Sequence, residues 1–226
     1  MKTTLRLSVL GAAVLAILAG CATPGFLDLR APPAIAAGSA DAGAQKATVC
    51  IACHGPTGVS PVPNFPNLAG QKFDYLYWRL VELQHRNDSN SPMTPLLAPL
   101  ADADLRDLAA YFSAQAAVPA SGNANANAFA DGARLYLEGD AARGIVPCQG
   151  CHGVNGDGQV GSDQARYRTY PSLRGQHPLY VAQRLRDLRD GKDPLSSNNR
   201  IMHGVAQDLD DQSIQQIADW LQTTAP

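Results

Sequence analysis

Cys50-Ile51-Ala52-Cys53-His54 has a counterpart later in the chain, Cys148-Gln149-Gly150-Cys151-His152. In each copy, two cysteines are separated by two residues and followed directly by a histidine. Cys-x-x-Cys-His is the attachment signature of a c-type haem. The spacing lets each thiol form a thioether to one haem vinyl group, and the histidine can then bind the iron from one face. The two motifs therefore predict two covalently attached haem c groups.

Two other chemistries also use paired cysteines. A Cys-x-x-Cys pair can be a thioredoxin-like redox centre, but that requires a βαβ setting, which this sequence does not indicate. Two such pairs can together form a structural four-cysteine zinc site. Neither explanation accounts for a histidine directly after both pairs, so haem attachment is the preferred interpretation.

The start of the chain predicts secretion. Two basic residues precede an uncharged apolar run over residues 7–19, which is shorter than the roughly 20 residues of a membrane span. The run ends in Leu18-Ala19-Gly20-Cys21, which resembles the cleavage site of bacterial lipoproteins. We expect a lipoprotein-type signal peptide at residues 1–20 and a lipid on Cys21 that anchors the protein to a membrane. Ordinary cleavage further on, for example after Ala36, is the alternative.

The composition suits a soluble globular protein of one or two domains. The chain has 226 residues, of which 45% are hydrophobic, and a formal net charge of −2. It contains no basic block, so nucleic acid is not an expected partner. Secretion also places the protein in an oxidising compartment outside the cytoplasm, where haem is attached.

The two halves match beyond the cysteines, which indicates a duplicated domain. Pro66-Asn67-Leu68-Ala69-Gly70-Gln71 corresponds to Pro171-Ser172-Leu173-Arg174-Gly175-Gln176. Segments rich in alanine, proline, glycine or asparagine divide the chain into a flexible tether (21–40), an N-terminal domain (41–118), a linker (119–128) and a C-terminal domain (129–226).

Each copy has the apolar periodicity of a few helices joined by loops, which predicts an all-α fold. An amphipathic helix is expected over Phe73–Arg86, and its counterpart over residues 178–189. The last helix of each copy is expected to follow an aspartate N-cap, Asp102 in the first copy and Asp210 in the second.

Two methionines are the candidate sixth ligands of the haem irons. Met93 and Met202 lie at equivalent places in the two copies, just ahead of the last helix. Methionine is more often a core residue, but matched positions favour ligation. Histidine–methionine ligation raises the reduction potential and leaves no open coordination position. This predicts electron transfer rather than catalysis. His203, next to Met202, is an alternative ligand, but its counterpart in the first copy is Thr94.

Further residues are expected around each haem. An iron-bound histidine normally donates its other ring nitrogen to a carbonyl, and Pro66 and Pro171 are the expected acceptors. Six other side chains either bond haem propionates or are ordinary helix-surface residues: Gln71, Tyr75, Arg79, Gln176, Tyr180 and Arg184.

The sequence resembles the dihaem cytochromes c4 over most of residues 40–224. The resemblance rests on both haem motifs, on the Pro-x-Leu-x-Gly-Gln segments, on Leu108-Ala109-Ala110-Tyr111-Phe112-Ser113 and on Glu138-Gly139-Asp140-Ala141-Ala142-Arg143-Gly144-Ile145. It implies two tandem class I cytochrome c domains related by a pseudo-twofold axis. It also implies the axial pairs His54/Met93 and His152/Met202.

The resemblance further implies a periplasmic carrier in a respiratory chain, from the quinol-oxidising complex toward a terminal oxidase. Two alternatives remain. One is the cytochrome subunit of a dehydrogenase, such as a sulfide-oxidising flavocytochrome. The other is a dihaem peroxidase or thiosulfate-oxidising enzyme, which would need an open or unusually ligated haem.

Overall fold

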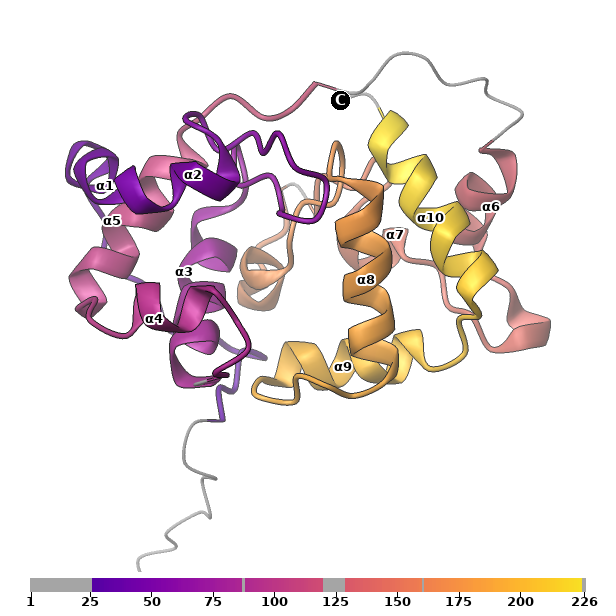
Figure 1. Cartoon of the computed structure of the whole chain (residues 1–226). Coiled ribbons are helices and arrows are strands. Elements are labelled where there is room, and N and C mark those ends of the chain that lie inside the picture. Colours follow the sequence, from indigo (N-terminus) through magenta and orange to yellow (C-terminus); the bar gives the residue numbers. More distant parts are fainter. Residues whose placement is uncertain (1–25, 87, 120–128, 160, 225–226) are drawn as a thin grey trace, which may run out of the picture.

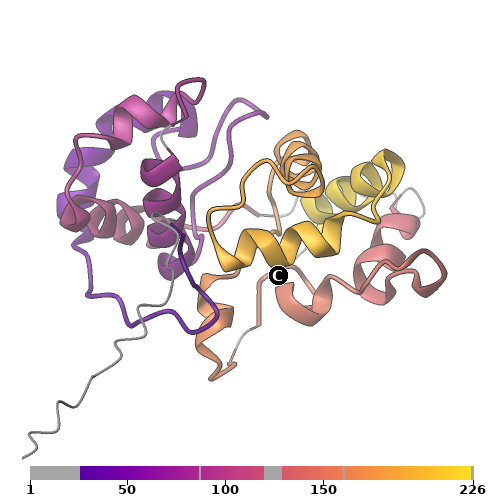
Figure 2. The same ribbon diagram turned by 90° about the horizontal axis from the view of Figure 1, so that it is seen from below.

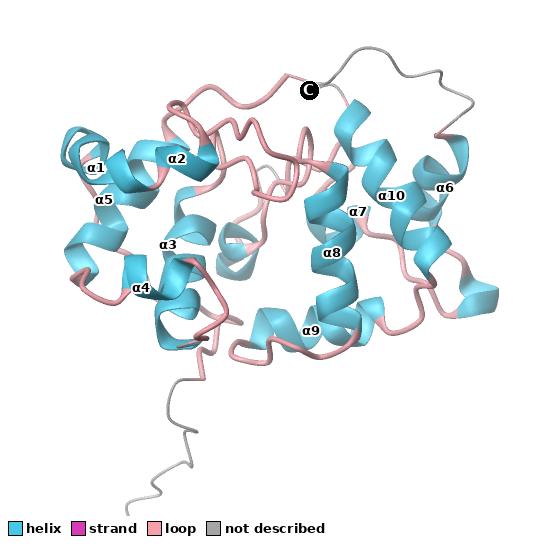
Figure 3. Cartoon of the chain, viewed as in Figure 1, coloured by secondary structure: helices cyan, strands magenta, loops and turns pink. Residues whose placement is uncertain are grey.

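A computed structural model describes residues 26–86, 88–119, 129–159 and 161–224. Within these ranges the regular elements are all helical, as Figure 3 shows, and β-pairing is confined to two isolated bridges. The predicted signal peptide, Cys21 and all but the first residue of the predicted linker lie outside the described residues.

The N-terminal domain contains five α-helices in this order: α1 (Ala40–Lys46), α2 (Ile51–His54), α3 (Phe73–Arg86), α4 (Met93–Leu97) and α5 (Asp102–Ser113). A 3-10 turn, η1 (Ala47–Val49), links α1 to the first haem motif. The C-terminal domain repeats the order with α6 (Ala130–Glu138), α7 (Gln149–His152), α8 (Pro178–Arg189), α9 (Ser197–Ala206) and α10 (Asp211–Thr223). It adds η2 (Ala141–Arg143) and η3 (Ala165–Thr169).

The two domains lie side by side and face each other through the segments around α3 and α8 (Figure 1). Figure 2 shows the same two groups of helices from below. Each domain has its own apolar core. The N-terminal core includes Leu76, Leu105 and Phe112, and the C-terminal core includes Leu135 and Ile214.

One glycine in each domain allows its first and last helices to cross closely. A side chain at Gly43 would collide with the Asp107 carbonyl of α5, and one at Gly132 with the Gln216 carbonyl of α10. Glycine lacks a β-carbon, so the backbones can approach at these points. The same close crossing of the first and last helices therefore occurs in both domains.

The predicted helix limits agree with the structure in most places. α3 and α8 have the expected bounds, and Asp210 caps α10 by accepting a hydrogen bond from the Ser213 N–H. The predicted N-cap Asp102 is instead the first residue of α5, whose N-cap is Ala101. The Asp104 carboxylate accepts from the Ala101 N–H, and Asp102 accepts from the Tyr77 hydroxyl.

The predicted tether is docked rather than free over residues 26–39. The Leu27 backbone pairs with the C-terminal domain by donating to the Leu195 carbonyl and accepting from the Ser197 N–H. Its side chain packs against the N-terminal core, and Leu29 is 2% exposed. Burial of these leucines explains why an Ala- and Pro-rich segment is held in place. None of the helices in the described ranges is long and apolar enough to cross a membrane.

Candidate functional site

The histidine of each haem motif is buried and has one ring nitrogen engaged. His54 and His152 end the single-turn helices α2 and α7 and are each 6% exposed. Nδ1 lies 2.9 Å from the Pro66 carbonyl in His54 and 3.2 Å from the Pro171 carbonyl in His152. A carbonyl can only accept, so Nδ1 carries the proton and Nε2 keeps its lone pair for a metal. Both hydrogen bonds are those expected from the sequence.

A glycine after each histidine turns the chain sharply. Gly55 and Gly153 have φ values of 78° and 77°, which a residue with a β-carbon rarely adopts. A side chain there would also collide with the carbonyl of Val59 or Gly158. The tight return brings the loop back over the histidine toward the proline that accepts from it.

Burial keeps both imidazoles uncharged at neutral pH. It lowers the pKa of His54, and it lowers the pKa of His152 to about 4, with the proline carbonyls partly opposing the effect. The positive charge of Lys72 adds to the lowering at His152. A neutral imidazole is the form that ligates iron.

The two candidate methionine ligands occupy matching places in the fold. Met93 begins α4 and packs against the N-terminal core, as does Cys50. Met202 lies in α9 and packs against the C-terminal core, as does Cys148. His203 instead has Nδ1 2.8 Å from the Leu188 carbonyl, so it packs at the end of α8.

The cysteine environment does not favour the zinc alternative. Cys50, Cys53 and Cys148 are half-buried and Cys151 is exposed. Over the described residues, no group of three or more His, Cys, Asp or Glu side chains is arranged to hold a metal ion. The two cysteine pairs therefore do not form one four-cysteine site.

A buried carboxylate joins two of the predicted propionate-binding arginines. Asp193 accepts from Arg79 of the N-terminal domain at 2.8 Å and from Arg184 of its own domain at 3.1 Å. Its side chain is 1% exposed. Burial alone would raise the pKa of Asp193, but the two guanidinium groups outweigh it and the pKa is below its ordinary value. The cluster is therefore charged and links the domains.

Polar groups near this cluster fit the acidic edge of a haem. Three guanidinium groups, Arg79, Arg86 and Arg184, are matched here by three carboxylates, Glu82, Asp88 and Asp193. Among the described residues, two buried donors lack a hydrogen-bond partner: Asn199 Nδ2, whose side-chain oxygen accepts from Arg184, and Trp78 Nε1 on the same helix as Arg79. Because buried donors are normally satisfied, the spare Asn199 donor and the neighbouring Arg184 guanidinium would suit a carboxylate of a haem.

Tyr75 and Tyr180 belong to the same region. Burial raises the pKa of Tyr75, with the neighbouring Tyr180 adding to the effect and the charges of Arg79 and Arg184 opposing it. The phenol of Tyr75 is therefore protonated and able to donate. A role for these tyrosines and arginines toward propionates stays a proposal.

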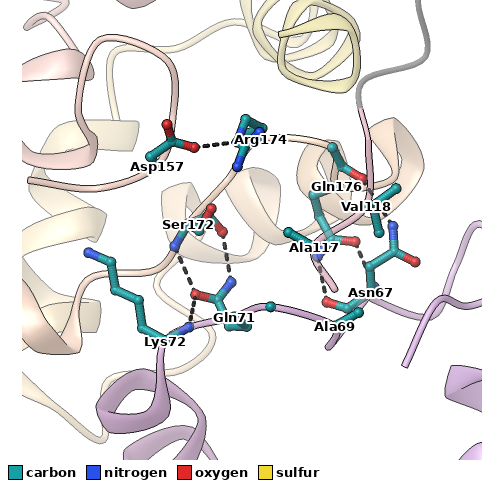
Figure 4. Close-up of a pocket in the computed structure, with 12 residues that line it drawn as sticks. Asn67, Ala69, Gln71, Lys72, Ala117, Val118, Asp157, Ser172, Arg174 and Gln176 are labelled. Carbon is teal, nitrogen blue, oxygen red and sulfur yellow. Dashed lines mark hydrogen bonds and ion pairs between the residues drawn. The ribbon is translucent and has the colours of Figure 1, made fainter. Parts of the chain in front are cut away.

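Gln71 and Gln176 do not fit the propionate role or the surface role. Both are buried between the domains, outside any helix (Figure 4). Gln176 Oε1 accepts from the Asn67 N–H at 2.8 Å, and its Nε2 donates to the Asn67 carbonyl at 2.9 Å. Gln71 makes the equivalent pair with Ser172, at 2.8 Å for both bonds. Each amide thus pairs with the backbone of the opposite domain.

Sequence reasoning missed Asp193, Glu82, Trp78 and Asn199. Asp193 lies in the loop between α8 and α9, and neither spacing nor repetition distinguishes it from other surface aspartates. For Glu82 there was a usable signal, because it follows Arg79 by three residues and is thus its neighbour on the helix.

Comparison with known proteins identifies relatives of the whole two-domain unit. Residues 129–225 match the Cytochrome c family. Cytochrome c4 of Stutzerimonas stutzeri is 40% identical over 196 residues, which cover 83% of this chain and 90% of that protein. A thiosulfate dehydrogenase electron acceptor of Thiomonas intermedia is 35% identical and covers 88% of this chain and 87% of its own.

A solved structure has the same arrangement of helices. The crystal structure of reduced recombinant cytochrome c4 from Pseudomonas stutzeri superimposes with a TM-score of 0.71 at 38% identity, and it covers 83% of this chain and all of that one.

Proposed function

Because this chain belongs to the cytochrome c4 family, we propose that it is a periplasmic, membrane-tethered carrier that passes electrons from a quinol-oxidising complex to a terminal oxidase. Membership makes it a dihaem electron-transfer cytochrome with two covalently bound haem c groups. The route, the partners and the tether are the proposed part.

The observation that carries the proposal is a buried histidine and a core-packed methionine repeated in both domains. Each has a buried neutral histidine with Nδ1 engaged by a proline carbonyl, and a methionine on the same apolar core as the motif cysteine. When bound, haem c supplies the one-electron chemistry of its iron. We assign His54 and Met93 as the residues that would ligate the iron of the first haem, and His152 and Met202 as those that would ligate the second.

The surrounding residues suit transfer without a substrate. The proline carbonyls fix the orientation of the two imidazoles, and the apolar cores exclude water from the ligand side. Arg79 and Arg184, which Asp193 holds together, are the residues that would bond the haem propionates. With a histidine and a methionine bound, each iron would have no position left for peroxide or another small substrate.

The proposed tether is a lipid on Cys21. We expect the mature protein to begin at Cys21 and to fractionate with membranes. Cys21→Ser should release it into the soluble fraction with its haem content unchanged. A mature N-terminus further along, such as after Ala36, would contradict the tether and leave the carrier role intact.

Rapid mixing tests the proposed route. The purified oxidised protein is mixed with a quinol-oxidising complex and quinol, and the reduced protein with membranes containing the terminal oxidase. Fast reduction in the first experiment and fast reoxidation in the second are expected. Failure in either would remove that complex as a partner.

A second candidate function is that of the electron acceptor of a thiosulfate dehydrogenase. The similarity to the Thiomonas intermedia protein of that name favours it. The same mixing experiment with such a dehydrogenase and thiosulfate distinguishes the two. Faster reduction by the dehydrogenase than by the quinol-oxidising complex would favour this candidate. Co-purification with a stoichiometric flavoprotein would instead indicate a subunit of a sulfide-oxidising enzyme.

A further inference from the structure

One side chain of each domain contacts the loop that follows the haem motif in the other domain. The two side chains follow the interface glutamines, Lys72 after Gln71 and His177 after Gln176. Lys72 Nζ donates to the Tyr167 carbonyl at 3.1 Å, and His177 Nε2 lies 3.0 Å from the Ser60 carbonyl. Lys72 and His177 thus occupy equivalent positions in the two domains.

Lys72 reaches the immediate surroundings of His152. The Gly158 N–H donates to the His152 carbonyl at 2.7 Å, and a side chain at Gly158 would collide with the Lys72 ammonium. The lysine therefore covers the loop that returns over the histidine.

Asp157 of the C-terminal domain attracts the Lys72 ammonium, but the same carboxylate also pairs with Arg174, so the three side chains together carry one positive charge. Asp157 and Arg174, which line the same interdomain cleft, form an ion pair with each other (Figure 4). The corresponding residues of the N-terminal loop, Val59 and Ala69, are uncharged. The crossing residue on that side is a histidine, His177, rather than a lysine. The C-terminal domain thus receives a lysine ammonium where the N-terminal domain receives an imidazole.

We propose that Lys72, a residue of the N-terminal domain, raises the reduction potential of the haem held in the C-terminal domain. The proposal rests on the proposed function only in assuming that both haems are redox-active. Reduction adds one electron to the ferric iron and gives ferrous iron, with no other change in composition. A nearby positive charge favours the reduced form because that form is less positive. Lys72 is partly buried, so water and salt screen it incompletely.

The charge acts only while the interface is closed. Lys72 comes from the opposite domain and is placed by the Gln71 hydrogen bonds, one of which it makes through its own backbone N–H at 2.9 Å. The potential of the C-terminal haem is therefore coupled to domain contact, and an isolated C-terminal domain would lack the contribution.

The test is a spectroelectrochemical titration of the full-length holoprotein with Lys72→Gln. We expect the reduction equilibrium of the C-terminal haem to shift about three- to tenfold toward the oxidised form, a tenfold shift being about 59 mV for one electron. The N-terminal haem should keep its potential, and Lys72→Arg should restore the wild-type value. The variant Met202→His should lower the potential of the C-terminal haem. The titration step that moves in this variant is therefore the step of the C-terminal haem.

Two matched variants separate the charge from other effects. His177→Gln removes the pseudo-equivalent cross-domain contact without removing a lysine, and Lys192→Gln removes an exposed lysine of the C-terminal domain that pairs with Asp187 and Asp190. Both should leave the C-terminal potential close to wild type. The Lys72→Gln shift should also survive at roughly 1 M salt, where exposed charges act over only about 3 Å.

Three results would overturn the proposal. These are an unchanged C-terminal potential in Lys72→Gln, an equal shift of both haems, and a shift in Lys72→Arg as large as in Lys72→Gln. The titration uses chemical mediators rather than protein partners. A failure of the proposed electron route would therefore leave the expected shift unaffected.

Discussion

Replacing Gln176 by alanine should uncouple the two domains. Its side-chain amide makes two hydrogen bonds to the Asn67 backbone across the interface and accepts a third from the His177 N–H. Asn67 is only 7% exposed, so water cannot readily replace the lost partners. The variant leaves a buried N–H and a buried carbonyl of Asn67 without these bonds.

The magnitude follows from the number of groups left unpaired. Each buried polar group without a partner costs about 1–3 kcal/mol. The Asn67 Nδ2 bond to the Gly175 carbonyl, at 3.0 Å, remains and limits the opening. We expect Gln176→Ala to lower the free energy of unfolding by about 2–4 kcal/mol. Gln71→Ala should have a similar effect, because Gln71 makes the equivalent pair with Ser172.

Guanidinium unfolding of the holoprotein, followed by circular dichroism and by the haem absorbance, measures the effect. Gln183→Ala is the matched control, since Gln183 is an exposed glutamine of the same domain with a surface bond to Asp187. It should change stability by less than about 0.5 kcal/mol. If Gln176→Ala is no less stable than Gln183→Ala, the interface hydrogen bonds do not hold the domains together.

Three other outcomes are expected. Met202→Ala should let carbon monoxide bind the C-terminal haem only, and Met93→Ala the N-terminal haem only. An absorbance titration with carbon monoxide measures this, and binding at the haem whose methionine is intact would contradict the assignment. Leu29→Ala should cost about 2–5 kcal/mol of stability because Leu29 is fully buried, and a loss under 1 kcal/mol in thermal unfolding would mean that the docked N-terminal segment is not stabilising. The pKa of Asp193 is below its unfolded value of 3.8, so its stabilising charge is present above about pH 4 and is lost as pH falls through the folded pKa. The difference in the free energy of unfolding between wild type and Asp193→Asn should therefore be constant from pH 5 to 7 and disappear in stronger acid. A difference that does not depend on pH would exclude the ion pairs as its source.

Local patterns predicted the helices and the histidine environment well. The apolar spacing of residues 73–86 and 178–189 matches α3 and α8, because an amphipathic helix shows its period directly in the sequence. The Pro66 and Pro171 carbonyls were predictable because each lies in the loop that must close over its motif histidine.

Contacts between the domains could not be predicted in the same way. Gln71 and Gln176 precede amphipathic helices, where a polar residue usually faces water, but the pseudo-twofold contact buries both. Lys72 and His177 cross the interface for the same reason. A duplicated sequence shows that two domains exist, but the surfaces they share depend on side chains that are far apart in the chain.

Carbon monoxide binding to the reduced holoprotein tests the central claim most directly, namely that each haem is closed by a histidine and a methionine of its own domain. We expect two low-spin haems, the methionine–iron absorption band in the ferric spectrum, and no change in the ferrous spectrum when carbon monoxide is added. A carbon monoxide shift of either haem in the wild-type protein would show an open iron. It would contradict the carrier function for that domain.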